Sequence, residues 1–390
     1  MDWIEKTTRM KILTVDIGTG TQDIYLFDSQ WGIENGYKLI LPSPTLMVRK
    51  ELQQAARAHQ DVLLSGVLMG GGPSGWGVFD HLRQGLKVYA TAEAALSFDD
   101  DLQALQQKGI LLVSEEEART LPREIRRICM RDFDFNVIRE AFHLFGVSLD
   151  DLTAVAIAVF DHGNAPLDIS DRKFRFDYLD ERIRAENRLS AFAYAAEKIP
   201  AQMTRLQAVA NSSRDIPAQV IVMDTAPAAV LGATLDPLTQ RHERGLFLNI
   251  GNMHTLAFRL GSEGIEGVFE HHTGLLDQAH LEELLLRFAE GSLTNENVFG
   301  HHGHGALIYS DQPLPMDHED YNLVVTGPRR SVLQTSPLKP YFAAPYGDMM
   351  IAGCFGLLRA TADVIPELRE PILAGLAGKN AAVAPWELEA

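Results

Sequence analysis

Cysteine is nearly missing from this chain, which contains only Cys129 and Cys354 among its 390 residues. Two cysteines so far apart argue against a disulfide framework and against an iron–sulfur cluster held by cysteine thiolates. So few cysteines are typical of a reducing compartment, and we expect a cytoplasmic protein.

Long hydrophobic runs are missing as well. No stretch approaches the ~20 apolar residues of a membrane-spanning helix, so a membrane partner is not expected. The first eleven residues, MDWIEKTTRMK, contain acidic residues and no apolar segment, and we do not expect them to act as a signal peptide.

Positive charge is in deficit, with 35 lysines and arginines against 52 acidic residues and a net charge of −17. Such a surface repels phosphate backbones and anionic headgroups, so we expect neither nucleic acid nor a membrane surface as a partner. A nucleotide is still possible, because it arrives with a metal ion and is held by local backbone N–H groups. At roughly 100–200 residues per domain, the length predicts two domains.

The same local pattern occurs twice along the chain. Residues 11–28, KILTVDIGTGTQDIYLFD, place two β-rich runs around a short Gly/Thr/Asp segment, which predicts a hairpin. Residues 245–260, GLFLNIGNMHTLAFRL, repeat the pattern. Two related lobes that each open with such a hairpin would explain the repeat, but hairpins are common and the pattern alone leaves duplication open.

The first of these turns has the composition of a phosphate-binding loop. Gly18 and Gly20 allow a phosphate to approach the backbone closely, and successive N–H groups in such a turn form an anion-binding concavity. Asp16 ends an apolar strand, where a hydrated Mg²⁺ would justify a carboxylate. A plain structural turn is the alternative. The second turn, 249–255, has one glycine fewer and no acid, and is weaker by itself.

Two other glycine motifs do not fit the first turn. A dinucleotide fingerprint needs a third glycine and a following helix, whereas Asp23 stands at that position and a strand-like run follows it. A P-loop needs GxxxxGK[ST], which the sequence lacks.

Taken in order, several segments resemble the actin-like ATPase superfamily, which includes heat-shock chaperone ATPases and acetate and sugar kinases. DIGTGTQD (16–23) resembles its first phosphate loop, AVAIAVFDHG (154–163) a strand before a helical crossover, VIVMDTAPAAVLGATLD (220–236) the first connecting element, FLNIGNMHTLAFRL (247–260) the second phosphate loop, LVVTGPRRSVL (323–333) the adenosine loop and IAGCFGLLRA (351–360) the second connecting helix. The resemblance implies an α/β, two-lobed actin-like ATPase (ribonuclease H-like) fold, with duplicated mixed sheets flanked by helices and a central nucleotide cleft.

The resemblance also implies ATP and Mg²⁺ as ligands and assigns roles by position. Asp16 would hold Mg²⁺ through water, and Asp224, or less directly Asp161, would orient the attacking water or substrate hydroxyl. Gly353 would allow close packing of the connecting helices at the hinge. The nucleotide itself would be held by Gly18, Thr19, Gly20, Thr21 and Gln22 in the first loop, by Asn249, Gly251, Asn252, His254 and Thr255 in the second, and by Gly327 and Pro328 under the adenine and ribose.

Departures from the superfamily pattern leave the activity open. The second loop begins with Asn249 where members usually have aspartate, and Asn252 and Met253 follow Gly251 where a Gly-Gly pair is usual. Losing a carboxylate weakens metal binding and base function together. Three hypotheses follow: a Mg²⁺-dependent ATPase or small-molecule kinase, a nucleotide-sensing scaffold without turnover, or a histidine-based metal enzyme.

More narrowly, the sequence resembles a prokaryotic family labelled as pyruvate formate-lyase activating protein. A radical activator of that kind would need a CxxxCxxC motif, which two isolated cysteines cannot provide. We place the N-terminal lobe with the first phosphate loop at 1–215, the C-terminal lobe with the second phosphate and adenosine loops at 216–365, and a tail at 366–390.

Three further features have open interpretations. The histidines between 242 and 318, including His271-His272 and His301-His302 with His304, suit a transition metal, although a polar surface loop is the favoured interpretation. His271-His272-Thr273-Gly274 is alternatively a phosphate or substrate contact. Residues 69–75 form either a second anion-binding turn or a tight strand-to-helix turn. Residues 115–117 form either an acidic first helical turn or contain a catalytic glutamate. Helices are expected at 93–107, 115–128, 134–145, 179–210, 278–290 and 348–365.

Overall fold

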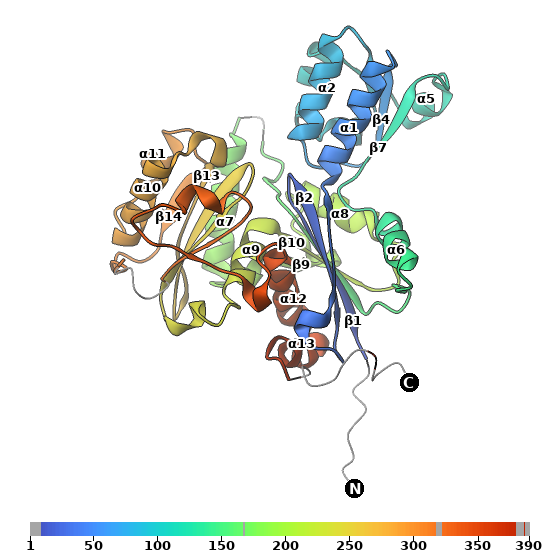
Figure 1. Ribbon diagram of the computed structural model, residues 1–390. Coiled ribbons are helices and arrows are strands. Elements are labelled where there is room, and N and C mark those ends of the chain that lie inside the picture. The colour runs from blue at the N-terminus through green and yellow to red at the C-terminus, as the bar shows by residue number, and fades with distance from the viewer. Residues whose placement is uncertain (1–8, 167, 317–321, 380–385, 387–390) are drawn as a thin grey trace.

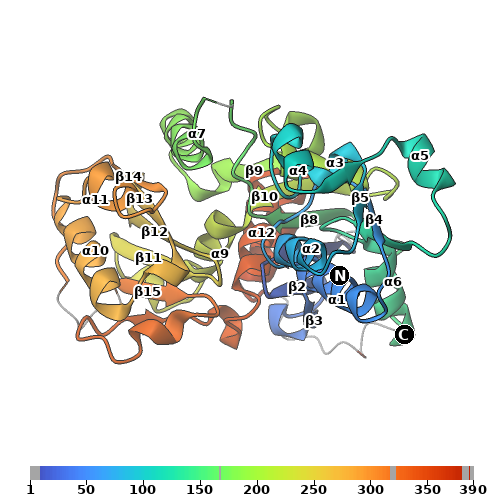
Figure 2. The same ribbon diagram turned by 90° about the horizontal axis from the view of Figure 1, so that it is seen from above.

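The structure is a computed structural model and describes residues 9–166, 168–316, 322–379 and 386. Two six-stranded sheets form the body of the molecule, and a four-stranded sheet forms a smaller unit beside the first of them (Figure 1). Figure 2 shows the two large sheets on opposite sides of a central helical layer that contains α9 (Thr225–Ala233) and α12 (Ala352–Val364).

The first sheet has the strand order β3-β2-β1-β8-β10-β9. Its strands are β1 (Lys11–Ile17), β2 (Thr21–Asp28), β3 (Tyr37–Pro42), β8 (Ala154–Val159), β9 (Ala193–Ala195) and β10 (Gln219–Asp224). The β1–β2 pair is the predicted hairpin. Strand β8, AVAIAV, is buried along its whole length, as expected for a parallel strand with both faces covered.

The second sheet has the order β14-β13-β12-β11-β15-β16. Its strands are β11 (Gly245–Ile250), β12 (His254–Gly261), β13 (Gly264–His272), β14 (Gly305–Ile308), β15 (Leu323–Thr326) and β16 (Tyr341–Phe342). Five neighbouring strands in each sheet are related in the same way: β3, β2, β1, β8 and β10 have the same parallel and antiparallel relations as β13, β12, β11, β15 and β16. The predicted duplication of a mixed sheet is therefore present, and the chain has the two-lobed actin-like architecture.

The smaller unit is inserted between β3 and β8, where Figure 1 shows it projecting beyond the first sheet. Its parallel sheet has the order β6-β5-β4-β7, with β4 at Val62–Gly66, β5 at Val88–Ala90, β6 at Ile110–Leu112 and β7 at Arg126–Met130. The helices of this unit and the one that follows it are α1 (Pro44–Arg57), α2 (Pro73–Arg83), α3 (Ala92–Ala95), α4 (Leu102–Gln107), α5 (Glu115–Thr120) and α6 (Phe135–Leu144).

The remaining helices are distributed over both lobes. Helix α7 (Asp171–Ala185) lies beside the second sheet although its sequence falls between strands of the first (Figure 1). The others are α8 (Thr204–Ser212), α10 (Gln278–Glu290), α11 (Asn295–Phe299) and α13 (Arg369–Leu376). Helix α10 matches its prediction because Asp277 caps its first turn and Gly291, at φ 77°, ends it.

Helices α9 and α12 cross closely at two glycines. A Cβ atom on Gly232 would lie 1.8 Å from the carbonyl oxygen of Ala352, and one on Gly356 would lie 1.9 Å from that of Ala228. No side chain fits at either position, so glycine is needed for the crossing. The sequence assigned close packing of these helices to Gly353, where a Cβ atom would lie 1.8 Å from Asp16 Oδ2, and this role of Gly353 stays a prediction.

Several predicted helices are interrupted by strands or by non-helical turns. Residues 93–107 form α3 and α4 with a break between them, 115–128 form α5 and then part of β7, and 179–210 contain β9. The sequence of β7, RRICM, begins with two exposed arginines, so the alternation that turns Ile128 and Met130 toward the core is not evident from the sequence. Residues 293–316 contain α11 and β14 rather than a continuous loop.

The predicted boundary after residue 215 falls just before β10, which belongs to the first sheet. The predicted tail contains α13, whereas 380–385 and 387–390 lie outside the described residues. None of the helices in the described part of the chain combines the length and apolar character needed to cross a bilayer.

Candidate functional site

A cleft of about 970 Å³ lies where the two lobes and the smaller unit meet. Its size is in the range of small-molecule and cofactor sites. Both predicted phosphate loops and the predicted adenosine loop line it, although they are separated by hundreds of residues in sequence. The predicted site residues on its wall are Asp16, Gly18, Thr19, Gly20, Thr21, Asp161, Asn249, Gly251, Asn252, His254, Gly327, Pro328 and Gly353.

The two hairpin turns have the same backbone geometry. The Gly18 N–H donates to the Thr21 carbonyl at 2.9 Å, and the Gly251 N–H donates to the His254 carbonyl at 2.9 Å. Each hydrogen bond therefore closes a turn around two residues, Thr19-Gly20 in the first hairpin and Asn252-Met253 in the second. This correspondence makes Asn249 the counterpart of Asp16, so the two lobes present a carboxamide and a carboxylate at equivalent positions.

The two turns also approach each other across the cleft. A Cβ atom placed on Gly20 would lie 2.7 Å from Nδ2 of Asn252. A side chain at position 20 would therefore displace Asn252 of the opposite lobe. The glycine-rich segment after β4 is close to the same place, since Gly72 would bring a Cβ atom within 3.8 Å of Thr19 Cγ2.

Asp16 is held at the end of β1 and lines the cleft. Its Oδ1 atom accepts a hydrogen bond from Thr225 Oγ1 at 2.5 Å, while the Gly353 backbone packs over its other oxygen. Burial, opposed by that hydrogen bond, raises the pKa of Asp16 to about 6. The carboxylate thus stays ionised at neutral pH but at a free-energy cost that a bound cation would offset.

Asp23 is a second acid at this position that the sequence interpretation did not include. The hairpin register pairs Asp23 directly with Asp16. Burial and the neighbouring Asp16 raise the pKa of Asp23 to about 8, and its Oδ1 atom has no hydrogen-bond partner among the described residues. Counting the register outward from the turn could have identified it, because pairing Gly18 with Thr21 places positions 16 and 23 opposite each other.

The structure does not bring Asp224 to the cleft wall. Asp224 is fully buried, caps α9 through the Ala226 N–H and accepts a hydrogen bond from Arg175 Nη1 at 2.6 Å. Asp161 does line the cleft, but its two oxygens accept the backbone N–H groups of Gly163 and Leu206, at 2.8 and 2.9 Å. Burial raises the pKa of both carboxyl groups.

Arg175 joins the lobes beneath the cleft and gave no signal in the sequence, because α7 is charged on most sides. Its guanidinium is fully buried, donates to Asp224 in the first sheet and, through Nε, to Glu270 in the second at 2.7 Å. It also lies over the Phe160 ring, 4.1 Å from the centroid. This ionic bridge fixes β10 relative to β13.

Two predicted contact residues point away from the cleft. Gln22 donates from Nε2 to the Pro42 carbonyl at 3.1 Å, which ties β2 to β3. Thr255 is fully buried and forms a 3.0 Å hydroxyl–hydroxyl hydrogen bond with Thr273. Both follow from the strand alternation, since each residue directly follows a position that faces the cleft.

Histidines gather at the floor of the cleft, in a grouping that the sequence did not show. His162 follows β8, His254 begins β12, and His304 precedes β14. Burial lowers the pKa of all three well below the usual value, to about 3 for His254, so the rings are neutral at pH 7. Of the predicted histidine loop, only His304 reaches this group, whereas His301 and His302 are exposed.

The sequence analysis left alternative interpretations for three other features. His272 lines the cleft close to His304, with 4.6 Å between the ring centroids. Gly70, Gly71 and Gly72 line it too, and Gly72 N-caps α2 at φ 48°. Residues 115–117 form the exposed acidic first turn of α5, where Ser114 and Glu117 make a capping box.

The sequence matches the family described as "Putative pyruvate format-lyase activating enzyme (DUF1786)" over residues 69–332. The chain belongs to this family. The matched region begins just after β4, ends in the segment after β15, and so includes the second hairpin and every member of the histidine group. A search of curated proteins found no match.

Solved structures with similar folds share little sequence with this family member. An exopolyphosphatase-like protein is 7% identical over 75% of this chain and 58% of its own, with a TM-score of 0.24. A ROK hexokinase from Thermus thermophilus is 12% identical over 66% and 47%, with a TM-score of 0.23. The ethanolamine utilization protein EutJ from Carboxydothermus hydrogenoformans is 10% identical over 90% and 88%, with a TM-score of 0.32.

The chain thus spans about half the length of the first two of these proteins. At these TM-scores the fold assignment depends on the equivalent strand orders of the two large sheets, described above, and not on the superpositions.

Proposed function

We propose that this protein binds ATP with Mg²⁺ in the cleft between its lobes and is an ATPase or a small-molecule kinase. The observation that supports the proposal is the pair of glycine turns, one from each lobe, which have the same closing hydrogen bond and meet at Gly20 and Asn252. Backbone N–H groups from two sides of one cleft suit a chain of phosphates.

The acids at the first turn fit a magnesium ion. Asp16 and Asp23 are paired in the hairpin, both line the cleft, and neither has a lysine or arginine ion-pair partner in the described part of the chain. Mg²⁺ prefers one or two carboxylates together with water and phosphate oxygens. In this proposal Asp16 holds the ion through water, and Asp23 lies opposite Asp16 in the hairpin, where the charge of the ion would favour release of its proton.

The other predicted residues have defined parts in this proposal. Gly327, at φ 97°, turns the chain after β15 so that it and Pro328 pass under the adenosine. Asp161 orients a water or substrate hydroxyl at the cleft wall, whereas Asp224 acts from behind it through the Arg175 bridge. Bound Mg²⁺ would neutralise charge on the phosphates, and the chain itself supplies positioning and exclusion of water.

Calorimetric titration of the purified protein with ATP, with and without Mg²⁺, tests the proposal. We expect the Asp16→Asn variant to lose the Mg²⁺-dependent part of the affinity, because the carboxylate charge is gone. Asp215→Asn, at an exposed position outside the cleft, is the matched control and should bind as the original protein does. Undiminished Mg²⁺-ATP affinity in Asp16→Asn would remove the basis of the proposal.

A nucleotide-sensing scaffold without turnover is the second candidate, and Asn249 favours it. Asn249 stands on the cleft wall where the equivalent position of the first lobe has Asp16, so the second lobe offers no carboxylate there. An overnight assay of ADP release separates the two candidates. Turnover that disappears in Asp161→Asn supports the enzyme, and nucleotide binding without ADP release supports the scaffold.

A further inference from the structure

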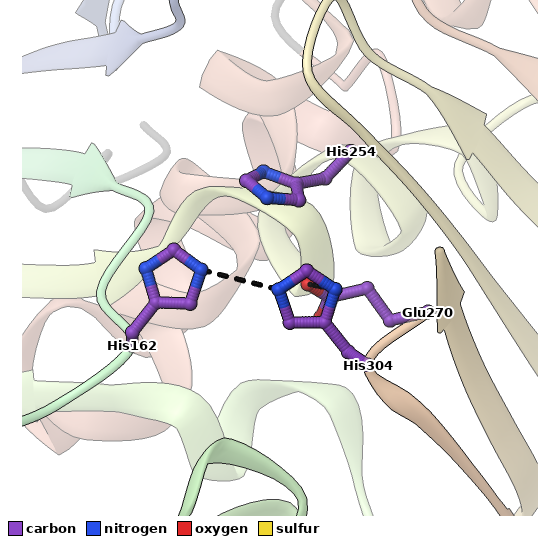
Figure 3. A group of neighbouring side chains, drawn as sticks. All are labelled: His162, His254, Glu270 and His304. Carbon is purple, nitrogen blue, oxygen red and sulfur yellow. Dashed lines mark hydrogen bonds and ion pairs between the residues drawn. The ribbon is translucent and has the colours of Figure 1, made fainter. Parts of the chain in front are cut away.

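Three imidazoles from three distant segments converge at the floor of the cleft (Figure 3). His162 comes from the first lobe, after β8, while His254 and His304 come from the second lobe, at the starts of β12 and β14. The carboxylate of Glu270, on β13, lies directly behind His304 (Figure 3). One ligand atom from each of these four residues can be chosen so that all lie within 4.8 Å of one another.

The distances suit a metal ion between the rings. His162 Nε2 and His304 Nε2 face each other at 3.3 Å. Two nitrogens bound to one tetrahedral metal at about 2.0–2.1 Å are separated by about 3.3–3.4 Å. The remaining separations, each within 4.8 Å, need to contract by up to about 1.5 Å, and side-chain rotation of His254, which lines the cleft, is the movement that would supply this.

Glu270 stands where an orienting carboxylate would stand. Its Oε1 atom lies 3.5 Å from His304 Nδ1, and its other oxygen accepts from Arg175. Both Glu270 Oε1 and His304 Nδ1 are buried and have no hydrogen-bond partner among the described residues. A metal on Nε2 would keep the proton of His304 on Nδ1 and draw it toward Glu270, which satisfies both atoms.

The group lies between a buried ion-pair network and the open cleft. The Arg175 guanidinium beside it is paired with two buried carboxyl groups, those of Asp224 and Glu270. His162, His254 and His304 line the cleft, whereas Glu270 is fully buried behind them. Three protein ligands and one position open to a cleft is the arrangement of catalytic zinc sites.

We propose that His162, His254 and His304 form a divalent transition-metal site with one coordination position open to the cleft, and that Glu270 orients His304. Three imidazoles are ligands that suit zinc, copper, iron and nickel rather than Mg²⁺. The site is separate from the pair Asp16 and Asp23 and does not depend on the proposed nucleotide binding. Its open position takes water or an oxygen of a ligand held in the cleft.

The test is a titration of the full chain, produced without a histidine tag and stripped with a chelator, with Zn²⁺ and then with Co²⁺ in the absence of nucleotide. We expect one Zn²⁺ per chain by calorimetry and elemental analysis, and a Co²⁺ absorption spectrum typical of a low-coordinate nitrogen site. His162→Gln and His304→Gln should each lower the Zn²⁺ affinity at least 100-fold and abolish the Co²⁺ spectrum.

His301→Gln is the matched control, because it removes an exposed imidazole three residues from His304. It should leave stoichiometry and spectrum unchanged. Loss of binding in His301→Gln with retention in His162→Gln would overturn the proposal in favour of the surface loop. Absence of stoichiometric binding by the original protein would overturn it outright. Circular dichroism and thermal melting check that each variant is folded, and His254→Gln provides a third position if either of the other two variants unfolds.

Glu270→Gln tests the positioning role. A carboxylate that accepts a hydrogen bond from a metal-bound imidazole typically contributes a factor of 10–100 in affinity, so we expect a loss of roughly that size. The Co²⁺ spectrum should still appear at higher Co²⁺ concentration, because all three nitrogens remain. An unchanged affinity would show that Glu270 does not orient His304. The Asp16→Asn variant should bind Zn²⁺ normally, so failure of the nucleotide proposal and failure of the metal proposal can be told apart.

Discussion

The Nη1 atom of Arg175 donates to Oδ2 of Asp224 at 2.6 Å, and neither side chain reaches solvent. Arg175 belongs to α7, which lies beside the second sheet, whereas Asp224 ends a strand of the first sheet. The same guanidinium binds Glu270 on the second sheet. The bridge lies beneath both the glycine turns and the histidine group. Its integrity therefore controls how the two walls of the cleft are placed.

Removal of this arginine should destabilise the protein strongly. Arg175→Met leaves two buried carboxyl groups without their partner, and breaking a buried pair typically costs about 3–5 kcal/mol. Urea denaturation followed by circular dichroism measures the loss. Arg184→Met, which removes an exposed pair with Asp180, should cost no more than about 1 kcal/mol. Equal losses in the two variants would contradict the importance of the bridge.

The crossing of α9 and α12 should tolerate no side chain at its closest points. Gly232→Ala and Gly356→Ala would each place a methyl group within 2 Å of a backbone oxygen, at 1.8 and 1.9 Å. Overpacking typically costs about 1–3 kcal/mol, and fixed backbone atoms place these sites at the upper end of that range or above it. Thermal melting provides the measurement. Gly274→Ala is the control, because nothing lies within 4 Å of the added carbon; a comparable loss there would show that the crossing is not special.

Asp23 should make stability depend on pH in metal-free buffer. Burial raises its pKa from 3.8 to about 8, so between these values the folded state holds a proton that the unfolded state has released. The free energy of unfolding therefore falls as pH rises from about 4 to about 8. We expect Tm to decline over this interval and the decline to be smaller in Asp23→Asn. A variant with the same slope as the original protein would contradict the assignment.

The two thiols should differ completely in reactivity. Cys129 is exposed on β7, whereas Cys354 is buried in α12, where burial raises the pKa of its thiol well above the usual value. A thiol-specific reagent should modify one cysteine in the native protein and both in urea. Cys129→Ser should abolish the native reaction. Rapid modification of two thiols without denaturant would show that α12 opens readily.

Much of the fold could be predicted from local patterns. The hairpin at 11–28, the strand 154–159 and the helix α10 all depend on signals within a few residues of one another, such as the Asp277 cap and Gly291. Strands β7, β9 and β13 were missed. The polar positions of β7 and β13 face solvent or ion-pair partners that only the folded sheet supplies, as Glu270 in β13 shows with Arg175.

The candidate site likewise has one part that the sequence predicts and another that it does not. The glycines and acids of the first turn could be identified because a hairpin places neighbours in sequence next to each other in space. By contrast, Arg175, Glu270, His162 and His304 are brought together by packing between lobes, and no spacing along the chain records their distances. The sequence by itself therefore determined the two turns and the strands that carry them. Tertiary structure alone decided which buried charges and imidazoles meet between those turns, because burial and long-range contacts arise only when the sheets assemble around α9 and α12.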